Sequence, residues 1–481
     1  MTATPSIAMP AGRVSPATAA RESRLRLLLA SGGDDRLWLD PVSRRNRYGA
    51  PAGPAPDELW FSSSTASAIS HRGWSAADDT LGRLAEFGAF TICAWFDALR
   101  GRLQALYGAP GCEVVLSASG TEAEFVALDL ALALAESPLV NIVVAPAETG
   151  SGVPAAASGR HFLGRASLGA AVAKSERLVG WEGAPLSLVT IEIRGSDGAL
   201  RAQADVDQEA AHRVERAVSG GAFALLHVLD ASKTGRPGVS RAAAADILAR
   251  HPGRVMVVVD ACQLRCPAEA IRQDLEAGLA VMLTGSKFAG GPAFCGALML
   301  PAALCERLAR LRPGPSPLAP YSAALDWPRS LRRFARGLAQ PANLGLGLRW
   351  TAALAEIEAF ERIAPAWRAS LMAEFDRAVR DRVAADPGLA LLDPASQAAA
   401  PGLIAVVHAD GSDPRPVYEA LAEGRPGLRP CHLGQPVAVG ARTALRVCAS
   451  MPMIADAAEH GFSALETDLD EAFASWAKQR A

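Results

Sequence analysis

Val-Met-Val-Val-Val-Asp-Ala-Cys-Gln (255–263) and Leu-Thr-Gly-Ser-Lys-Phe-Ala-Gly-Gly-Pro (283–292) decide the fold of this chain. The first stretch is an apolar run that ends on the carboxylate of Asp260, and the second carries Lys287 in a turn of small residues. The two side chains are 287 − 260 = 27 residues apart, which leaves room for a helix and a returning strand. We therefore predict that Asp260 and Lys287 reach one edge of a sheet.

A lysine and an aspartate in this arrangement are the two protein groups that pyridoxal phosphate (PLP) chemistry requires. The Lys287 amine can condense with the aldehyde of the cofactor as a Schiff base, while the Asp260 carboxylate pairs with the pyridinium nitrogen and keeps the ring an electron sink. Either group alone is common, because strand-end aspartates occur in many α/β proteins and Gly-Ser-Lys is a short motif. Two further motifs decide the interpretation.

The first of these is Leu-Ser-Ala-Ser-Gly-Thr-Glu-Ala-Glu-Phe (116–125), where an apolar strand runs into small residues and then into a helix that begins near Thr121. The amides left without partners at a helix start, together with the helix dipole, form an anion site without any Lys or Arg. A phosphate would fit there. The simpler alternative is that Ser119 or Thr121 only caps the helix, and the two roles are compatible.

The second is His-Val-Leu-Asp-Ala-Ser-Lys-Thr-Gly-Arg-Pro (227–237), which follows another apolar strand and opens into a polar turn. The four motifs in this order resemble the fold-type I PLP enzymes, most closely the class V aminotransferase group that also holds cysteine desulfurases and kynureninase. The resemblance covers roughly residues 75 to 460. It implies that PLP is the cofactor.

The resemblance assigns a role to each matching position. The residues that would hold the cofactor phosphate are Ser119, Gly120, Thr121, Thr284 and Ser286. Thr234 would bind the ring hydroxyl, Asp260 the pyridinium nitrogen, and Lys287 would form the Schiff base. Gln263 would lie against the cofactor. Lys233 lies where the family has no Schiff-base lysine, so we expect it to face solvent or substrate.

One loop departs from the family pattern. The family usually places an aromatic residue or a histidine over the cofactor ring, on the loop that corresponds to residues 140–152, and no aromatic residue is present there. Glu148, Thr149 or Ser151 would take this place, or His161 would reach back to it. The alternative for His161 is a structural or surface role.

The eight cysteines are scattered, mostly in apolar runs, which indicates buried residues in a reducing compartment. Cys262-x-x-x-Cys266 lacks the spacing of a zinc site, so no metal is expected. Cys431 lies in a polar, turn-forming stretch where cysteine desulfurases carry a mobile nucleophilic cysteine. The surrounding sequence does not match their loop, and we favour an ordinary loop cysteine.

Composition excludes several classes of function. The chain has 481 residues, of which 50% are hydrophobic and 20% charged, as expected of a globular protein with a large core. A net charge of −2 without a basic stripe disfavours nucleic acid as a partner. Apolar runs are too short to span a bilayer, so we expect no membrane segment and a cytoplasmic location.

The order of elements predicts an α/β fold with three regions: an N-terminal arm (1–75), a large PLP-binding domain (76–343) and a small C-terminal α+β domain (344–481). Strands expected in the large domain are 113–116, 139–145, 186–193, 222–229, 255–260, 280–283 and 295–300. Because Ala-rich helices separate them, we predict a three-layer, mostly parallel sheet, the fold-type I PLP transferase fold. The four motifs fall at its carboxyl edge, where such sheets bind ligands.

The other two regions are predicted from composition and pattern. Residues 1 to about 60 are rich in Pro, Gly and Ala and should form an extended arm without a core. The hydroxyl cluster at 61–73 would, by resemblance, lie over the substrate cavity, or it is a plain linker. In the small domain we expect one long helix from 344 to about 384, then strands near 389–393, 403–409 and 443–449, with helices at 414–423 and 456–478.

Arg446 lies among apolar neighbours in the last of these strands. Burying an unpaired guanidinium is costly, so Arg446 needs an anion. The family places a carboxylate-binding arginine on this strand, and arginine can hold a carboxylate through two parallel hydrogen bonds. We favour this substrate role over the alternative, a structural ion pair with Asp or Glu.

The resemblance and the residues together imply a PLP-dependent enzyme acting at the α carbon of an amino acid. Aminotransfer is the first expectation, and a PLP-dependent lyase reaction (elimination, retro-aldol cleavage or decarboxylation) is the alternative. A homodimer is expected, because the family's active site lies at the subunit interface. A catalytically lapsed PLP-binding protein is a different class of hypothesis, against which Lys287, Asp260 and Arg446 together argue.

Overall fold

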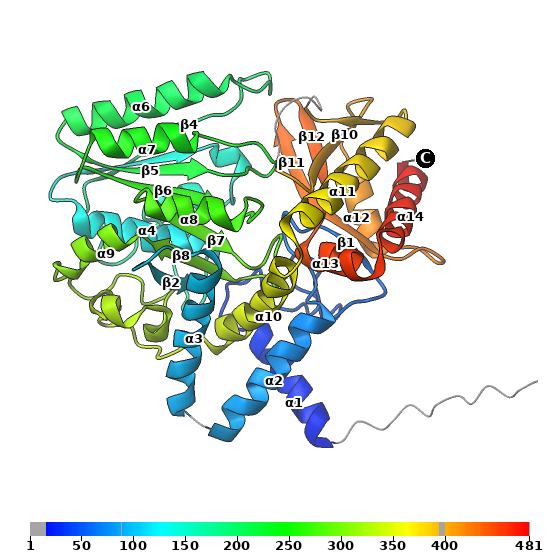
Figure 1. Cartoon of the computed structure of the whole chain (residues 1–481), viewed down its shortest axis with the longest axis horizontal. Coiled ribbons are helices and arrows are strands. Elements are labelled where there is room, and N and C mark those ends of the chain that lie inside the picture. Colours follow the sequence, from blue (N-terminus) through cyan, green and yellow to red (C-terminus); the bar gives the residue numbers. More distant parts are fainter. Residues whose placement is uncertain (1–15, 88, 394–399, 481) are drawn as a thin grey trace, which may run out of the picture.

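Short apolar runs that alternate with helices build a seven-stranded sheet in the computed structural model, which describes residues 16–87, 89–393 and 400–480 (Figure 1). Its strands lie in the order β2-β8-β7-β6-β5-β3-β4. Strand β8 is antiparallel to both neighbours, and all other pairs are parallel. The strands are β2 (Glu113–Ser117), β3 (Leu139–Val144), β4 (Leu186–Ile191), β5 (Phe223–Leu229), β6 (Val255–Ala261), β7 (Ala280–Thr284) and β8 (Gly296–Leu300). The prediction of a mostly parallel sheet is confirmed.

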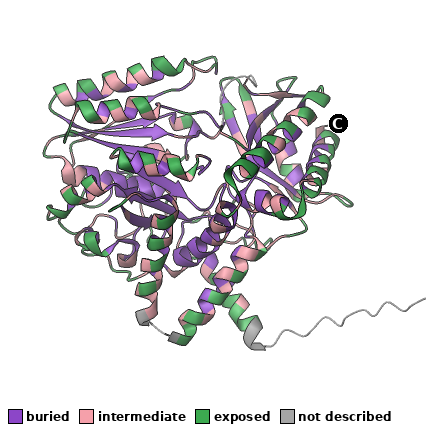
Figure 2. Ribbon diagram, in the orientation of Figure 1, coloured by how far each residue is buried: buried purple, intermediate pink, exposed green. Residues whose placement is uncertain are grey.

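Helices cover both faces of this sheet, because successive strand residues point to opposite sides. In β6, Val255, Val257 and Val259 pack toward one set of helices, and Met256 and Val258 pack toward the other. The first set is α3 (Ala89–Tyr107), α6 (Gln203–Ser219), α7 (Arg241–Arg250) and α8 (Ala268–Glu276), and the second is α4 (Gly120–Leu134) and α9 (Ala302–Ala309). Figure 2 shows the strands buried between the two layers. The predicted three-layer α/β fold is confirmed.

A second, five-stranded sheet lies beside the first, in the order β1-β11-β12-β10-β9. Strands β1 and β11 are parallel, and the remaining pairs are antiparallel. The strands are β1 (Leu59–Phe61), β9 (Leu389–Leu391), β10 (Leu403–His408), β11 (Cys431–Val439) and β12 (Arg442–Cys448), and the helices of this part are α10 (Leu344–Glu361), α11 (Pro365–Ala385), α12 (Arg415–Glu423), α13 (Met451–His460) and α14 (Ser463–Arg480). The expected α+β region at the C-terminus is therefore present. Short helical segments complete the chain: η1 (Pro146–Glu148), α5 (Val153–Ala157), η2 (Ala324–Asp326) and η3 (Arg329–Ala335).

Two predicted helices of this second region need correction, and one strand was missed. The long helix expected from 344 to about 384 is two helices, the second of which begins at Pro365, a position that suits proline. The helix expected at 456–478 is also two helices, separated at Gly461, where φ is +91°. Strand β11 was not expected. Its register shifts between Gly434 and Val437, so Pro436 lies in a bulge, where a strand tolerates proline.

The prediction of an extended N-terminal arm without a core is wrong for residues 16–29, which form helix α1 (Pro16–Leu29). Leu25 and Leu29 pack with Leu348 of α10 in a buried cluster. The buried Arg349 guanidinium donates hydrogen bonds to the carbonyl oxygens of Leu29 at 3.1 Å and Gly32 at 2.9 Å. Residues 1–15 of the predicted arm lie outside the described residues. Helix α2 (His71–Phe87) joins the same cluster through Ala77 and Leu81.

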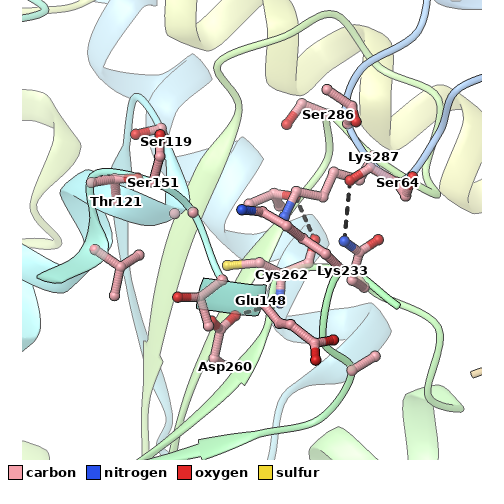
Figure 3. Close-up of a pocket in the computed structure, with 18 of the residues that line it drawn as sticks. Ser64, Ser119, Thr121, Glu148, Ser151, Lys233, Asp260, Cys262, Ser286 and Lys287 are labelled. Atoms are coloured by element: carbon pink, nitrogen blue, oxygen red, sulfur yellow. Dashed lines mark hydrogen bonds between the residues drawn. The ribbon is translucent and has the colours of Figure 1, made fainter. Parts of the chain in front are cut away.

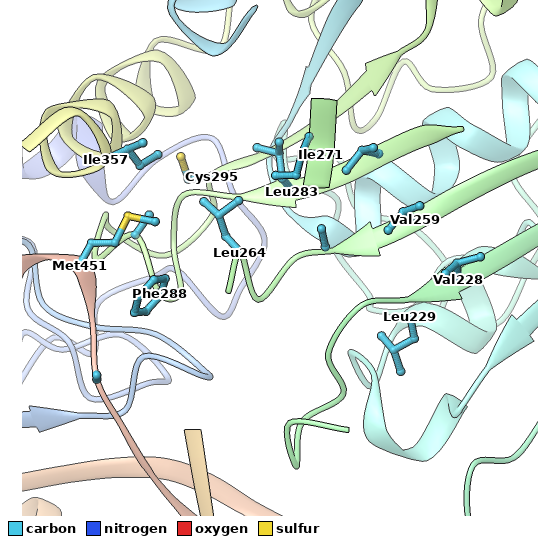
Figure 4. Packing of buried hydrophobic residues seen from close by; sticks show 14 of the residues in the cluster. Val228, Leu229, Val259, Leu264, Ile271, Leu283, Phe288, Cys295, Ile357 and Met451 are labelled. Carbon is cyan, nitrogen blue, oxygen red and sulfur yellow. The ribbon is translucent and has the colours of Figure 1, made fainter. Parts of the chain in front are cut away.

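One cluster of buried side chains joins the two sheets and fixes the floor of the space between them. Leu283 at the end of β7 and Phe288 in the following turn belong to the same cluster as Ile357 of α10 and Met451 of α13 (Figure 4). Close packing of this kind has low compressibility, so the turn that carries Lys287 has a rigid base. No helix within the described ranges is both long and apolar enough to cross a membrane.

Candidate active site

A cavity of about 360 Å³ opens at the carboxyl ends of the parallel strands, where Asp260, Lys233 and Lys287 lie (Figure 3). Residues of β11 and β12 also line it. Nine of the predicted site residues line it: Ser119, Gly120, Thr121, Asp260, Gln263, Thr284, Ser286, Lys287 and Arg446. Thr234 is not among the lining residues. The four sequence motifs therefore converge on one cavity, as their position at the strand ends predicts.

The anion site at the start of α4 combines a cap with a close approach of the backbone. Ser119 accepts a hydrogen bond from the Glu122 amide at 3.3 Å, so the capping alternative is correct for this residue. Gly120 packs so tightly that an added Cβ would lie 2.6 Å from the sulfur of Cys262. Glycine at this position lets the helix start approach the cavity. Ser119, Gly120 and Thr121 line the cavity, and the amides that a helix start leaves without intrahelical partners suit a phosphate.

Thr284 and Ser286, which shortly precede Lys287, differ in whether their hydroxyl is free to bind an anion. The Thr284 hydroxyl donates its hydrogen to the carbonyl oxygen of Cys262 at 2.7 Å, so it holds the end of β6 in place. Ser286 lines the cavity. The turn itself requires small residues, because an added Cβ at Gly285 would lie 2.5 Å from the Cβ of Ala353 in α10.

Asp260 and Lys287 reach the cavity from the neighbouring strands β6 and β7. One oxygen of Asp260, Oδ1, accepts a hydrogen bond from the Cys262 amide at 3.0 Å, which orients the carboxylate. The Lys287 side chain has no ion pair within the described part of the chain. Gln263 is held by a hydrogen bond from its Nε2 to the carbonyl oxygen of Ser64 at 3.1 Å, which leaves its buried Oε1 without a partner among the described residues.

Thr234 belongs to a buried charge network rather than to the cavity lining. Its hydroxyl contacts the Glu148 carboxylate and accepts a hydrogen bond from Nη2 of Arg194 at 3.0 Å. Arg194 also pairs with Asp393 at 2.8 Å. The residue next in sequence, Lys233, is the one that lines the cavity.

Lys233 is half-buried, and its environment weakens its hold on a proton. The pKa of Lys233 is lowered to about 8. Burial contributes most, followed by the positive charges of Arg446 and Lys287. Its Nζ lies 3.4 Å from the carbonyl oxygen of Ala147, and its amide donates to the carbonyl oxygen of Glu148 at 2.7 Å. Of the two expectations for Lys233, solvent or substrate, the structure places it in the cavity.

The loop over the cavity consists of small and polar residues, as the sequence indicated. Glu148, Thr149, Gly150 and Ser151 line the cavity. His161 does not line it, because its Nδ1 is hydrogen-bonded to the hydroxyl of Tyr321 at 2.7 Å in another part of the core. The alternative of a structural role is therefore correct for His161.

Arg446 of β12 is buried, and its guanidinium faces polar groups of the cavity wall. Nη2 donates to the Thr65 hydroxyl at 3.1 Å and to the carbonyl oxygen of Gln435, and Nη1 donates to the carbonyl oxygen of Lys233 at 3.4 Å. Nε has no partner among the described residues, and no Asp or Glu of these residues forms an ion pair with the guanidinium. Burial lowers the pKa of Arg446. The alternative of a structural ion pair therefore has no support in the described residues.

Two expectations about neighbouring residues are resolved. Ser64 and Thr65 from the hydroxyl cluster at 61–73 line the cavity, as the resemblance implied, so this segment is not a plain linker. Cys431 is buried in β11 instead of lying in a loop, and burial raises its pKa to about 12. A thiol of this kind stays protonated and unreactive.

Several lining residues escaped the sequence analysis. Tyr48 and Phe294 are aromatic lining residues that come from outside the 140–152 loop. His227 of β5 lies 3.2 Å from the Glu124 carboxylate. Burial lowers the pKa of His227, but Glu124 and Asp260 more than offset this, and the pKa is raised overall. No local pattern marks these residues, since each reaches the cavity only through tertiary packing.

Comparisons with known proteins support the fold. No protein-family model and no curated protein sequence matches the chain. Among solved structures, the cysteine desulfurase CsdA from Escherichia coli is 16% identical, with a TM-score of 0.54 over 88% of this chain and 95% of that one. A phosphoserine aminotransferase from Cytophaga hutchinsonii is 13% identical, with a TM-score of 0.56 over 87% and 99%. The cystine C-S lyase C-DES, solved with its product cysteine persulfide, is 14% identical, with a TM-score of 0.56 over 86% and 97%. The chain therefore has the fold-type I architecture of PLP-dependent transferases.

Proposed function

We propose that this chain is a PLP-dependent enzyme that acts at the α carbon of an amino acid through Lys287. The observation that carries the proposal is the convergence of Lys287 and Asp260 on one cavity, from the ends of adjacent strands. The start of α4 and the buried Arg446 open onto the same cavity. Cysteine desulfurases, a C-S lyase and an aminotransferase share the fold.

The residues present fit the cofactor. Ser119, Gly120, Thr121 and Ser286 would hold its phosphate, with Thr284 supporting the wall behind them. Asp260 would pair with the ring nitrogen. Gln263 would lie against the ring with its Oε1, which has no partner among the described residues. When bound, PLP supplies an electron-withdrawing ring that stabilises negative charge at the substrate α carbon. Thr234 is turned toward Glu148, which disfavours its expected contact with the ring hydroxyl.

The side chains of this chain would perform the remaining steps. Arg446 binds the substrate carboxylate through two parallel hydrogen bonds and so orients the α carbon. Lys287 removes the proton at this carbon and returns one, a role that suits the readily shifted pKa of lysine. The walls from β11 and β12 exclude water, which strengthens each of these charge interactions.

Aminotransfer is the first proposed reaction. A lyase reaction is the second, because the loop above the cavity consists of small and polar residues. Glu148, Thr149, Gly150 and Ser151 leave room for chemistry on the substrate side chain where a ring-stacking aromatic would fill space. Small differences in side-chain position decide which substrate bond is broken. Both kinds of reaction occur among the proteins named above.

The organisation of the protein is part of the proposal. We infer an N-terminal arm (1–75), a large PLP-binding domain (76–343) and a small domain (344–481), with β1 of the arm completing the sheet of the small domain. A cytoplasmic homodimer is the expected form. The deciding experiment is product analysis of the PLP-loaded protein with a panel of amino acids, with and without a keto-acid acceptor. A protein that binds PLP yet converts no amino acid would support the catalytically lapsed alternative instead.

A further inference from the structure

Lysine is rare in this chain, and half of its lysines meet in one cavity. The sequence contains four, at positions 174, 233, 287 and 478. Lys174 and Lys478 are exposed, whereas Lys233 and Lys287 both extend into the cavity (Figure 3). The proposed chemistry uses Lys287 only. Lys233 therefore needs a separate explanation.

The charges that line the cavity divide into paired and unpaired groups. Four lining side chains fall in three pairs of opposite charge: Arg36 with Asp34, Glu148 with Arg194, and Glu124 with His227 when the histidine is protonated. Four have no such neighbour within ion-pair distance among the described residues: Lys233, Lys287, Arg446 and Asp260. The unpaired set is three cations and one anion. If PLP occupies Lys287 and Asp260, two cations are left for the substrate.

Lys233 and Arg446 belong to the same wall of the cavity. The carbonyl oxygen of Lys233 accepts a hydrogen bond from Arg446, and the Lys233 Nζ lies beside Ala147, ahead of the polar loop 148–151. The phosphate cradle at Ser119–Thr121 is formed by a different strand end, that of β2. Keeping two partly desolvated cations together without an anion is unfavourable, and one monocarboxylate neutralises only one of them.

We propose that Lys233 binds a second anionic group of the substrate, so that the enzyme acts on amino acids with an acidic side chain. Arg446 then holds the α-carboxylate and Lys233 the side-chain carboxylate, sulfinate or phosphate. Ser64, whose buried hydroxyl has no partner among the described residues, lies on the same wall and can donate to either anion. This inference rests on the proposed function, because it takes Lys287 as the lysine bonded to the cofactor.

The test measures binding separately from turnover. The PLP-loaded protein is titrated by calorimetry with two unreactive dicarboxylates, succinate and glutarate, and with the monocarboxylate butyrate. We expect a dicarboxylate to bind at least about tenfold more tightly than butyrate, because one further charged hydrogen bond forms. Lys233→Met should abolish the preference without changing butyrate affinity, and Lys233→Arg should keep it. Lys174→Met, at an exposed lysine, is the matched control and should behave as wild type.

A second set of substrates identifies the anion and separates two failures. We compare kcat/KM for alanine with kcat/KM for four acidic amino acids: aspartate, glutamate, cysteine sulfinate and phosphoserine. Lys233→Met should reduce kcat/KM for the acidic amino acids and leave kcat/KM for alanine unchanged. If dicarboxylates and butyrate bind equally to the wild type, the inference is wrong. If Lys233→Met changes the visible absorbance or the PLP affinity without substrate, Lys233 serves the cofactor and the inference is also wrong. Failure of the proposed function itself would appear differently, as absence of a borohydride-stable PLP adduct on Lys287.

Discussion

The backbone carbonyl oxygen of Lys233 accepts a hydrogen bond from Nη1 of Arg446 at 3.4 Å. This contact joins the turn after β5 in the large sheet to β12 in the small one, at the wall of the cavity. It places Lys233 beside Arg446, whereas Asp260 and Lys287 reach the cavity from the ends of the neighbouring strands β6 and β7.

Lys287→Ala should abolish cofactor attachment. We expect the wild type loaded with PLP to be yellow and to carry PLP on Lys287 after borohydride reduction, whereas the variant should lose both the visible absorbance and the labelled peptide. Peptide mapping by mass spectrometry identifies the residue that carries the reduced PLP. Lys174→Ala should keep both signals. Recovery of the label on Lys233 would overturn the assignment, because Lys233 is the other lysine that lines the cavity in the described part of the chain.

Arg446→Ala should weaken carboxylate binding and leave the cofactor in place. Loss of charged hydrogen bonds worth about 1.5–3 kcal/mol each would raise KM at least about tenfold with an unchanged visible spectrum. Arg446→Lys should recover part of the loss, since a lysine supplies charge without the two parallel bonds. Unchanged kinetics with a lower melting temperature would mean that Arg446 is structural.

The strand ends were predictable from the sequence, whereas side-chain direction in the turns was not. Asp260 and Lys287 follow continuous apolar runs, and such runs end at the ligand-binding edge of a parallel sheet. In the turn 232–236, no apolar pattern determines which side chain faces the cavity. Which of Lys233 and Thr234 faces the cavity depends on Glu148 and Arg194, which are distant in sequence.

Tertiary packing also explains the missed elements of the N-terminus and the small domain. Helix α1 is held by Arg349, whose guanidinium binds backbone carbonyl oxygens more than 300 residues away, an interaction with no sequence signature. Strand β11 contains Gly434 and Pro436, which resemble a turn in the sequence, and only pairing with β12 shows that they form a bulge.

Arg194→Met should destabilise the fold more than a surface arginine does. Arg194 pairs with Glu148 and Asp393, and the exposed fractions of these three side chains are 8%, 5% and 7%. Removing the guanidinium leaves buried carboxylates without one of their partners, which typically costs about 3–5 kcal/mol. Urea unfolding measures the free energy of unfolding. Arg250→Met is the control, because its pair with Asp246 is exposed and should contribute less than about 1 kcal/mol. Equal effects of the two variants would contradict the buried network.

Binding of a second substrate anion should weaken as pH rises past about 8. The pKa of Lys233 is lowered to about 8 by burial, by Arg446 and by Lys287, with Glu148 acting in the opposite direction. Lys233 therefore carries its charge below this pH and loses it above. The affinity for glutarate should fall between pH 7.5 and 9.5, on the order of tenfold per pH unit at the upper end. The bound anion should raise the pKa of Lys233 in the complex, because it favours the charged amine. Lys233→Arg should give a flat profile over this range, because arginine stays charged. Parallel profiles for the two proteins would show that another group titrates.

Reaction type is decided by a single-turnover experiment without any keto acid. An aminotransferase must stop after one equivalent of amino acid, because the amino group stays on the cofactor and Lys287 cannot rejoin it until an acceptor arrives. Its visible absorbance should bleach and recover when a keto acid is added. A lyase instead releases product continuously and keeps the absorbance, because Lys287 returns to the cofactor in each cycle. The polar loop 148–151, which leaves room beside the substrate side chain, makes this second outcome a real alternative. Continued product release with the absorbance retained would exclude aminotransfer and make the chain a lyase.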